Sequence, residues 1–561
     1  MEWSSGCENI FAGGVVMYLQ LLFVLQSFLG GPLSDTPPCE DTYVIRIPHE
    51  LTIEENGSFQ IEMRENNLSS NQTLHIDLPS AFTLSDSHGK DDIEGHLNNC
   101  SFVYEMNDTG NRIVVYSIDE IPVGDWHGDL SITICLETTV ISNKLQKGSN
   151  INTYLDALEP KTITFSVSQT YSENDTDVSA ANDRSVLAHY ENDEVIIYTR
   201  DNGTMIANED MSSMFENLNN LETINGLNIP DLSSCTSFHK LFKGASKLKT
   251  ISGINYIDTG NIEDMSYMFD GCTSITRISL NNLDTSNCRN MSYMFSHCLN
   301  MTSPGSVRNW DLSKCENTSH MFYNCSKLKN VGSMASWNTA QVRDMSSMFE
   351  NCPLLTTTGN ISSWNVENVE SFNSMFKAAA SMVNIGDLSS WSISSQCKDL
   401  SKMFAYSEDI LPSSLDLRNW DVSYVEDMSG MFCNCFSINS IDIRGWDTSE
   451  VNDMSMMFSS DHGTLDSSLQ IVDGLGDIDV SSVTDMNHIF YGNKYLNCDL
   501  SGWKDSLGDL LDLSYAFWGC WNFDLSSLKD WNISSLCNTD EAFGNAAGSQ
   551  VASDIPDWYD H

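Results

Sequence analysis

The sequence predicts an α/β repeat solenoid of the leucine-rich-repeat kind, with one short helix and one short strand in each repeat, preceded by an all-β immunoglobulin-like domain. Two observations lead to this fold class. A phenylalanine returns every 26 to 28 residues through the C-terminal part of the chain, and short alternating apolar runs fill the part before it. A chain of 561 residues is also too long for one ordinary hydrophobic core. An array that extends in one direction accommodates this length, because each unit packs only on its neighbours.

The N-terminal segment 1–31 is predicted to be a signal peptide or an N-terminal anchor. Its twenty positions from Phe11 to Gly30 are uncharged, which is long enough to span a bilayer and compatible with a signal-peptide core. The residues before them include two glutamates and no Lys or Arg, so the positive flank of an ordinary signal is missing. A start at Met17 would shorten the core to the length of a signal. A buried helix is the third alternative; the first two place the remainder outside the cytoplasm.

Residues 39–167 are predicted to form the immunoglobulin-like β-sandwich. Runs such as "TYVIRIP", "SFQIEM", "RIVVYSI" and "TITFSVS" alternate apolar and polar residues and are separated by Asn, Gly, Asp and Ser. In "LSITICLE" the side chains of Ile132, Ile134 and Leu136 share one face. A disulfide between Cys100 and Cys135 inside this sandwich is an alternative that the sequence leaves open.

Short segments flank the repeats. Residues 168–184 are polar and rich in Ser, Asn and Asp, which is typical of a linker. Residues 185–209 contain two apolar runs on either side of "ENDE" and predict a β-hairpin that opens the array. At the other end, residues 546–561 are predicted to be an acidic C-terminal tail.

The repeats occupy residues 210–545, and one phenylalanine column sets their period. Its thirteen members stand 26 to 28 residues apart, except for a gap of 32 before Phe490 that holds an extra loop. A column that is often Trp stands twelve residues before the phenylalanine, and a Val or Ile column stands seven before it. Three aligned apolar columns indicate that every repeat buries the same face against its neighbours. The column phenylalanines are Phe215, Phe242, Phe269, Phe295, Phe322, Phe349, Phe376, Phe404, Phe432, Phe458, Phe490, Phe517 and Phe543.

Within one repeat, "DMSYMF" (residues 264–269) predicts the short helix. Asp264 can cap it, and Met265, Met268 and Phe269 stand at i, i+3 and i+4 on one apolar stripe. The alternation in "SIDIRGW" (residues 440–446) predicts the short strand. One helix and one strand in about 27 residues give the leucine-rich-repeat interpretation.

The units "WDTSEVNDMSMMF" (residues 446–458) and "NWDVSYVEDMSGMFCNC" (residues 419–435) resemble the repeat of the BspA-like leucine-rich-repeat bacterial surface proteins. The resemblance covers about residues 205–545. In that family, secreted surface proteins carry such arrays, sometimes beside immunoglobulin-like modules, and some members are linked to adhesion and to binding host extracellular-matrix or plasma proteins. The resemblance therefore implies a surface binding protein. It transfers no catalytic residues, because the family motif contains none.

The net charge of −49, from 77 acidic and 28 basic residues, excludes nucleic acid as an expected partner and disfavours anionic membrane surfaces. Membrane contact is therefore expected only through the N-terminal segment, if it stays uncleaved. The sequence contains no HExxH, Walker A, GxSxG or GxGxxG motif, and its twelve histidines do not recur with the repeat. We expect no enzyme, no catalytic residue and no cofactor.

The cysteines and methionines of the repeats are predicted to fill the core. Six cysteines lie three residues after a column phenylalanine and four occupy the Val or Ile column, where a free Cys replaces a small apolar residue. A ladder of reduced, buried thiols is the leading interpretation, with scattered disulfides and metal ligation as alternatives. The methionines beside the phenylalanine follow the same packing interpretation. The ten cysteines are Cys272, Cys298, Cys325, Cys352, Cys435 and Cys520, then Cys235, Cys288, Cys315 and Cys397.

A column of Asp and Asn follows the Trp position by one residue, as at Asp311, Asn338 and Asp447. Both side chains hydrogen-bond turn backbone locally, so the column is expected to stabilise a turn in every repeat. A ladder of calcium sites is the alternative. The chain lacks the Gly-Asp nonapeptide pattern of calcium-stacked β-rolls, and no metal ligand is assigned.

The function predicted from these features is an exported, secreted or cell-surface repeat protein. It would present an extended surface for adhesion to extracellular proteins or glycans, without catalysis. The alternatives are a structural or self-assembling surface component and, less favoured, a carbohydrate-active enzyme. Ligand-binding residues are expected among exposed positions that do not repeat, because the repeating columns serve packing.

Overall fold

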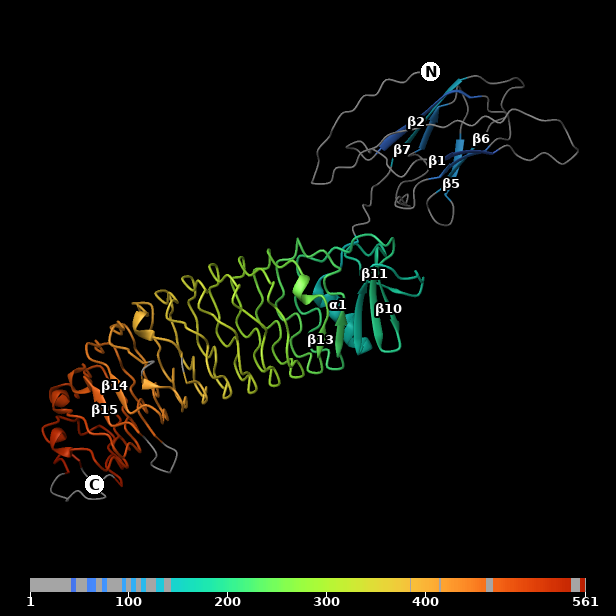
Figure 1. The fold of residues 1–561 in the computed structure, drawn as a ribbon. Helices are drawn as coiled ribbons and strands as arrows, with labels where there is room; N and C mark the ends of the chain where they lie inside the picture. The colour runs from blue at the N-terminus through green and yellow to red at the C-terminus, as the bar shows by residue number, and fades with distance from the viewer. Residues whose placement is uncertain are drawn as a thin grey trace, which may run out of the picture. The chain divides into compact units, whose positions relative to one another are not determined.

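The computed structural model divides the chain into two compact units, Met1–Ser142 and Asn143–His561 (Figure 1). In the first unit it describes strands between residues 42 and 135. In the second it describes residues 143–559 except 384, 413–414, 461–467 and 546–554. The uncharged segment from Phe11 to Gly30 lies outside the described residues. Among the residues described, no helix has the length and apolar character that crossing a membrane requires.

The described strands of the first unit form two sheets, ordered β1-β3-β6-β5 and β2-β7-β4. Strands β1 and β3 pair in parallel, and the other pairs are antiparallel. The immunoglobulin-like interpretation stays a prediction, and Cys100 lies outside the described residues. The strands are β1 (Thr42–Arg46), β2 (Ser58–Asn66), β3 (Thr73–Asp77), β4 (Ile93–His96), β5 (Phe102–Met106), β6 (Arg112–Ser117) and β7 (Gly128–Cys135).

The second unit begins earlier than the sequence boundary at residue 167. Helix α1 (Gly148–Leu158) and strand β8 (Thr162–Ser166) belong to it. Strand β8, the run "TITFSVS" that the sequence assigns to the sandwich, pairs in parallel with β11 (Glu194–Thr199) and β12 (Thr223–Asn225). Its Ile163 and Phe165 are buried in the core of the repeats. Alternation alone does not distinguish the two locations, because either sheet buries one face of the strand.

A six-stranded sheet, ordered β13-β12-β8-β11-β10-β9, covers the start of the repeats. It includes β9 (Thr176–Asp177), β10 (Val186–Glu191) and β13 (Thr250–Ile251). Strands β10 and β11 form a hairpin whose turn residues, Asn192 and Asp193, have φ of 53° and 63°, the left-handed backbone that tight hairpins need. The segment 168–184 is not only a connection, because β9 pairs with β10 and the buried Asp175 accepts a hydrogen bond from Tyr198 Oη at 2.5 Å.

The repeats form coils that stack in sequence order (Figure 1); a coil here is the repeat around one column phenylalanine, counted from Phe215 in coil 1 to Phe543 in coil 13. Neighbouring coils pair in parallel through a column five residues before the phenylalanine, from Asp210 to Asn538. Around this column alternate N–H groups donate to the next coil. Tyr267 N donates to Ser292 O at 2.9 Å and Phe269 N to Met294 O at 2.8 Å. The backbone polar groups of each coil are thus satisfied by its neighbours.

The predicted helix in "DMSYMF" is wrong, because these residues form turns. Tyr267 has φ of 58°, a left-handed conformation that an α-helix does not contain. Asp264 accepts from Ser266 N at 2.8 Å as a local turn instead of capping a helix. Met265, Met268 and Phe269 nevertheless point into the core. Turns with this inward spacing and a short helix therefore produce the same apolar pattern in the sequence.

Regular elements are sparse among the described repeats. Strands β14 (Ser440–Asp442) and β15 (Ile471–Asp473) pair in parallel, at one of the places where the sequence predicts a strand. The remaining elements are one-turn 3-10 helices on the Trp side of the coils. They are Ile254–Tyr256, Leu388–Ser390, Leu475–Asp477, Ser501–Asp505 and Leu525–Leu528.

The core consists of aromatic ladders that run through the stack. All thirteen column phenylalanines are buried, and each lies 5.1 to 5.9 Å from the next between ring centroids. The tryptophans of the Trp column form a second ladder, and their indole N–H groups donate to a carbonyl of the previous coil. Trp364 Nε1 donates to Met334 O at 3.0 Å, for example. Stacking and hydrogen bonding together hold each coil on its neighbours.

The C-terminal tail continues this core. Trp558 stacks on Trp531 at 5.8 Å, and its Nε1 donates to Leu528 O at 2.8 Å. Tyr559 meets the ring of Phe543, the last column phenylalanine, edge-on at 5.0 Å. Residues 555–559 therefore cover the last coil, a role that repeat arrays require at their ends.

Candidate functional site

The cysteines three residues after the phenylalanine have a more specific role than filling space. Cys325 Sγ donates to the carbonyl of Phe295, the column phenylalanine of the previous coil, at 3.0 Å. Ser407 and Asn493 occupy the same position in other coils and donate to the equivalent carbonyls. The position therefore favours a small hydrogen-bond donor. The same contact is made by Cys272, Cys298, Cys352, Cys435 and Cys520.

These thiols are poor candidates for chemistry. The thirteen cysteines in the described residues of the second unit are all free. Burial raises the pKa of the Cys352 thiol to about 12, and it also raises the pKa of the Cys325 thiol well above its usual value. A thiol needs to lose its proton to act as a nucleophile or a metal ligand. The protonated thiol is instead the form that donates to the phenylalanine carbonyl.

The Asp and Asn columns stabilise turns. In the column after the Trp position, Asp311 Oδ1 accepts from Ser313 N at 2.8 Å and Asn365 Oδ1 from Glu367 N at 3.0 Å. The pairing column does the same, as at Asp344, which accepts from Ser346 N at 2.9 Å. Among the described residues, no group of three or more His, Cys, Asp or Glu side chains is arranged to hold a metal ion.

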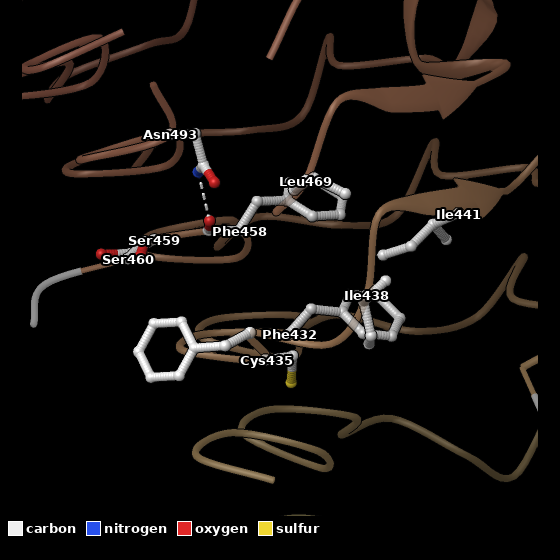
Figure 2. Close-up of a pocket in the computed structure, with 10 residues that line it drawn as sticks. Phe432, Cys435, Ile438, Ile441, Phe458, Ser459, Ser460, Leu469 and Asn493 are labelled. Atoms are coloured by element: carbon white, nitrogen blue, oxygen red, sulfur yellow. Dashed lines mark hydrogen bonds between the residues drawn. The ribbon is translucent and has the colours of Figure 1, made fainter. Parts of the chain in front are cut away.

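A pocket lies where the repeat spacing stretches to 32 residues (Figure 2). Its lining includes Phe432, Ile438, Ile441 and Phe458, which are core residues exposed by 3% or less. Asn493 Nδ2 donates to Phe458 O across it. Among the residues that the structure describes, the lining contains no acid, base or histidine. The described lining consists mainly of core side chains that pack between coils.

An alternating charge ladder runs along the column six residues before the phenylalanine. Its acidic and basic members alternate from coil to coil over seven coils. Arg289 lies 3.0 Å from Glu316, Arg343 lies 3.1 Å from Glu370, and Lys398 lies 2.9 Å from Glu426. Such exposed pairs contribute about 0.2–1 kcal/mol each. The full column is Glu263, Arg289, Glu316, Arg343, Glu370, Lys398 and Glu426.

Aromatic side chains gather at the turn around the column phenylalanine. We define the turn face as the positions three and two before, and one and two after, each column phenylalanine; it includes buried serines as well as half-buried and exposed side chains. In coils 2 to 5 it carries six rings, the N-terminal ring cluster. Tyr267 and Tyr293 stack at 4.5 Å between centroids, and Tyr293 and His320 stack at 4.3 Å. His239, His297 and Tyr323 complete the cluster by edge or tilted contacts of 5.2 to 5.9 Å. None of the six rings is fully buried.

Four more rings on the turn face form the C-terminal ring cluster, in coils 11 and 12. His488 stacks on Tyr515 at 4.7 Å, and Tyr491 stacks on Trp518 at 4.7 Å. The five coils between the clusters have few rings on this face. Two residues before the phenylalanine they carry Ser347, Ser374, Lys402, Gly430 and Met456.

A family model described as "Mycoplasma protein of unknown function, DUF285" matches residues 209–331, 299–413, 389–474, 411–504 and 462–558. The chain belongs to the DUF285 family. The five overlapping matches show that residues 209–558 of this DUF285 protein are repeats of one kind. The finer BspA-like assignment stays a prediction.

No curated protein matches this DUF285 chain. Solved structures that match include a chain from "Structure of the Toll - Spatzle complex, a molecular hub in Drosophila development and innate immunity", with 15% identity and a TM-score of 0.19. The match covers 54% of the DUF285 chain and 42% of that chain. The DUF285 protein thus spans less than half the length of that relative. A TM-score this low carries no argument about its fold.

The residue two before the phenylalanine has left-handed backbone in all thirteen coils of the DUF285 protein, whatever its side chain. Tyr267, Tyr293, His320 and Tyr515 all have φ between 57° and 58°. A left-handed residue other than glycine costs about 1–2 kcal/mol, and Gly430 fills the same position in another coil. Packing therefore does not require a ring there. The clusters are not predicted from the sequence, because this position is the variable "x" of "DMSxMF"; its aromatic residues in consecutive repeats are the available signal.

Proposed function

We propose that this DUF285 protein is an exported cell-surface protein that presents its coil stack for binding extracellular proteins or glycans and catalyses no reaction. The observation that carries the proposal is the pair of ring clusters on the turn face. In these clusters, side chains that differ from the repeat pattern lie close together. The other columns repeat because they serve packing, turns or the pairing of coils. Tyr and Trp are the residues that interfaces use most as anchors, because they combine apolar area with a polar tip.

The roles of the repeating columns support this proposal by elimination. The phenylalanines, tryptophans and cysteines of the repeating columns make contacts between neighbouring coils. The carboxylates of the Asp columns accept hydrogen bonds from turn backbone. In the described ranges this leaves the exposed, non-repeating positions as the surface that can distinguish one ligand from another. Stacked repeats offer such positions over a long face.

The sequence-based predictions of fold, export and partners belong to the same proposal. We propose a leucine-rich-repeat-like solenoid of the BspA kind that follows an immunoglobulin-like domain along the chain. The uncharged segment from Phe11 to Gly30 would direct export or anchor the chain, and it would be the only contact with a membrane. The charge of −49 argues against nucleic acid as a partner.

Two measurements test the proposed function. In cells that express the full chain, an external protease that cannot enter the cell should digest the protein, or the protein should be found in the medium. Purified full-length protein should also bind at least one member of a panel of extracellular-matrix proteins, plasma proteins and neutral glycans, without converting it. Protection inside intact cells, or binding to no member of the panel, would contradict the proposal.

A further inference from the structure

The two ring clusters lie on the same face of one stack, at a separation set by the coils between them. His320 ends the N-terminal cluster and His488 begins the C-terminal cluster, six coil steps further on. Parallel-paired segments lie about 4.8 Å apart, so the gap between the clusters is roughly 29 Å. A compact small molecule cannot touch both clusters. A linear polymer that runs along the stack can.

The side chains of the clusters offer polar edges to a ligand that lies along the stack. They are Tyr, His and Trp, each with a ring and a polar tip. Because the rings stack face to face, they cover much of each other's faces, and such a ligand meets mainly their edges. The hydroxyl groups of a sugar chain can hydrogen-bond to phenol, indole and imidazole edges.

The spacing of the rings also favours a sugar chain over an extended peptide. Within one stacked column, successive rings stand 4.3 to 4.7 Å apart, one per coil. An extended peptide places side chains on one face only about every 6.6 Å, so its side chains would fall out of step with the rings. A linear polysaccharide repeats one ring per sugar, which is closer to one unit per coil.

Charge selects a neutral polysaccharide. The net charge of −49 repels polyanions. At the N-terminal cluster, the charge of Lys243 is paired, because its Nζ lies 3.3 Å from Asp270 and 4.4 Å from the centroid of the Tyr267 ring. Lys240 stands one coil before Tyr267 in the same column, so the preference for a neutral chain rests on the net charge of the whole protein.

We propose that the two ring clusters are two subsites for one neutral linear polysaccharide that lies along the turn face. This proposal rests on the proposed function and specifies its ligand. Each cluster holds a few sugars weakly. A chain long enough to reach both clusters binds more tightly, because occupation of one subsite raises the effective concentration of the chain at the other.

Binding of manno-, cello-, xylo- and chito-oligosaccharides of increasing length to the full-length protein tests the inference. We expect at least one series to show a rise in affinity of more than about tenfold once the chain spans roughly 29 Å, the gap between the clusters. Tyr293→Ser and Tyr515→Ser each remove a ring from one cluster. Each should reduce the affinity for long chains to that for short chains, and the double variant should not bind.

The chain supplies its own controls. Ser347 and Ser374 occupy the position of Tyr293 in other coils, so serine is compatible with this backbone. Tyr256→Ser removes a tyrosine that is 77% exposed and outside the turn face, and it should leave binding unchanged. Thermal unfolding of each variant establishes that it is folded.

Several results would overturn the inference. They are binding that does not depend on chain length, binding that is equal in the Tyr293→Ser and wild-type proteins, and a preference for anionic glycans. Binding to an extracellular protein with no neutral glycan bound would overturn the inference and leave the proposed function standing. Binding to neither class would overturn both.

Discussion

The pairing column is the column five residues before the phenylalanine, through which neighbouring coils pair. It carries an Asp in five consecutive coils, so we expect the charge of these residues to affect stability. Asp427 is half-buried and pairs with Asp399 on one side and Asp453 on the other. Its Oδ1 accepts from Ser429 N at 2.8 Å. Burial raises the pKa of Asp427, the hydrogen bonds from Ser429 lower it, and the charges of Asp453 and Asp399 raise it. The carboxylate thus acts as a turn acceptor whose charge is unfavourable, and Asp427→Asn should stabilise the protein.

The magnitude follows from the neighbours. Asn290 and Asn317 occupy the same column and accept from their own turn N–H groups at 3.0 and 2.8 Å, so asparagine keeps the turn. The substitution removes two like-charge contacts between paired residues, each of which costs about 0.2–1 kcal/mol. We expect a gain of roughly 0.5–1.5 kcal/mol in the free energy of unfolding at pH 7.

The gain should depend on pH with a defined sign. The pKa of Asp427 is raised in the folded state, so the folded protein binds more protons than the unfolded chain between the two pKa values. Wild-type stability at this residue is therefore complete below the unfolded value of about 3.9 and is lost as the pH rises through the folded pKa. The advantage of Asp427→Asn should be full at pH 7 and should disappear near pH 3.5.

Urea unfolding of wild type and variant between pH 3.5 and 7.5 measures this difference. Asn317→Asp is the matched reverse change, since it adds a charge beside Asp344 in the same column, and it should destabilise at pH 7. Loss of stability in Asp427→Asn at pH 7, or stabilisation of the wild type by calcium that the variant lacks, would refute the reasoning. Either result would indicate that the column holds a cation.

Three further outcomes follow from the packing of the stack. Phe349→Ala should lower the free energy of unfolding by about 3–5 kcal/mol, because the ring is fully buried between Phe322 and Phe376; a loss below about 1 kcal/mol in urea unfolding would contradict this. Buried, protonated thiols such as Cys352 should resist alkylation at pH 8 in the native protein and react after unfolding without a reductant; rapid native labelling or blocked thiols would be inconsistent with the free ladder. Trp558→Ala should remove hydrogen-exchange protection from the last coil before any other, since residues 555–559 cover it; uniform loss along the stack would argue against a local cap.

The sequence predicted which residues are buried better than it predicted the backbone. The phenylalanine and tryptophan columns were visible because packing one coil on the next requires the same side chain at the same place each time. The helix in "DMSYMF" was wrong, because left-handed turns centred on residues such as Tyr267 and Gly271 bury the same positions as a helix would. The boundary near residue 167 was misplaced because β8 alternates as a sandwich strand does.

The candidate site was harder to predict, and the reason is physical. A binding surface on a repeat protein consists of positions that the repeat leaves free, so periodicity conceals it. The ring clusters became visible only when the turns placed Tyr267, Tyr293 and His320 on one face within stacking distance. The donor role of Cys325 was equally invisible, because its acceptor is a backbone carbonyl of another coil.

We propose that the repeating columns hold the stack together and the non-repeating rings bind the ligand. Comparing Phe349→Ala with Tyr293→Ser, for both the free energy of unfolding and the affinity for long neutral oligosaccharides, tests it most directly. We predict that Phe349→Ala loses about 3–5 kcal/mol of stability while its folded fraction binds as wild type does. Tyr293→Ser should lose no more than about 1.5 kcal/mol while its affinity falls more than about tenfold. Equal loss of stability in both variants with unchanged affinity in Tyr293→Ser would contradict the claim.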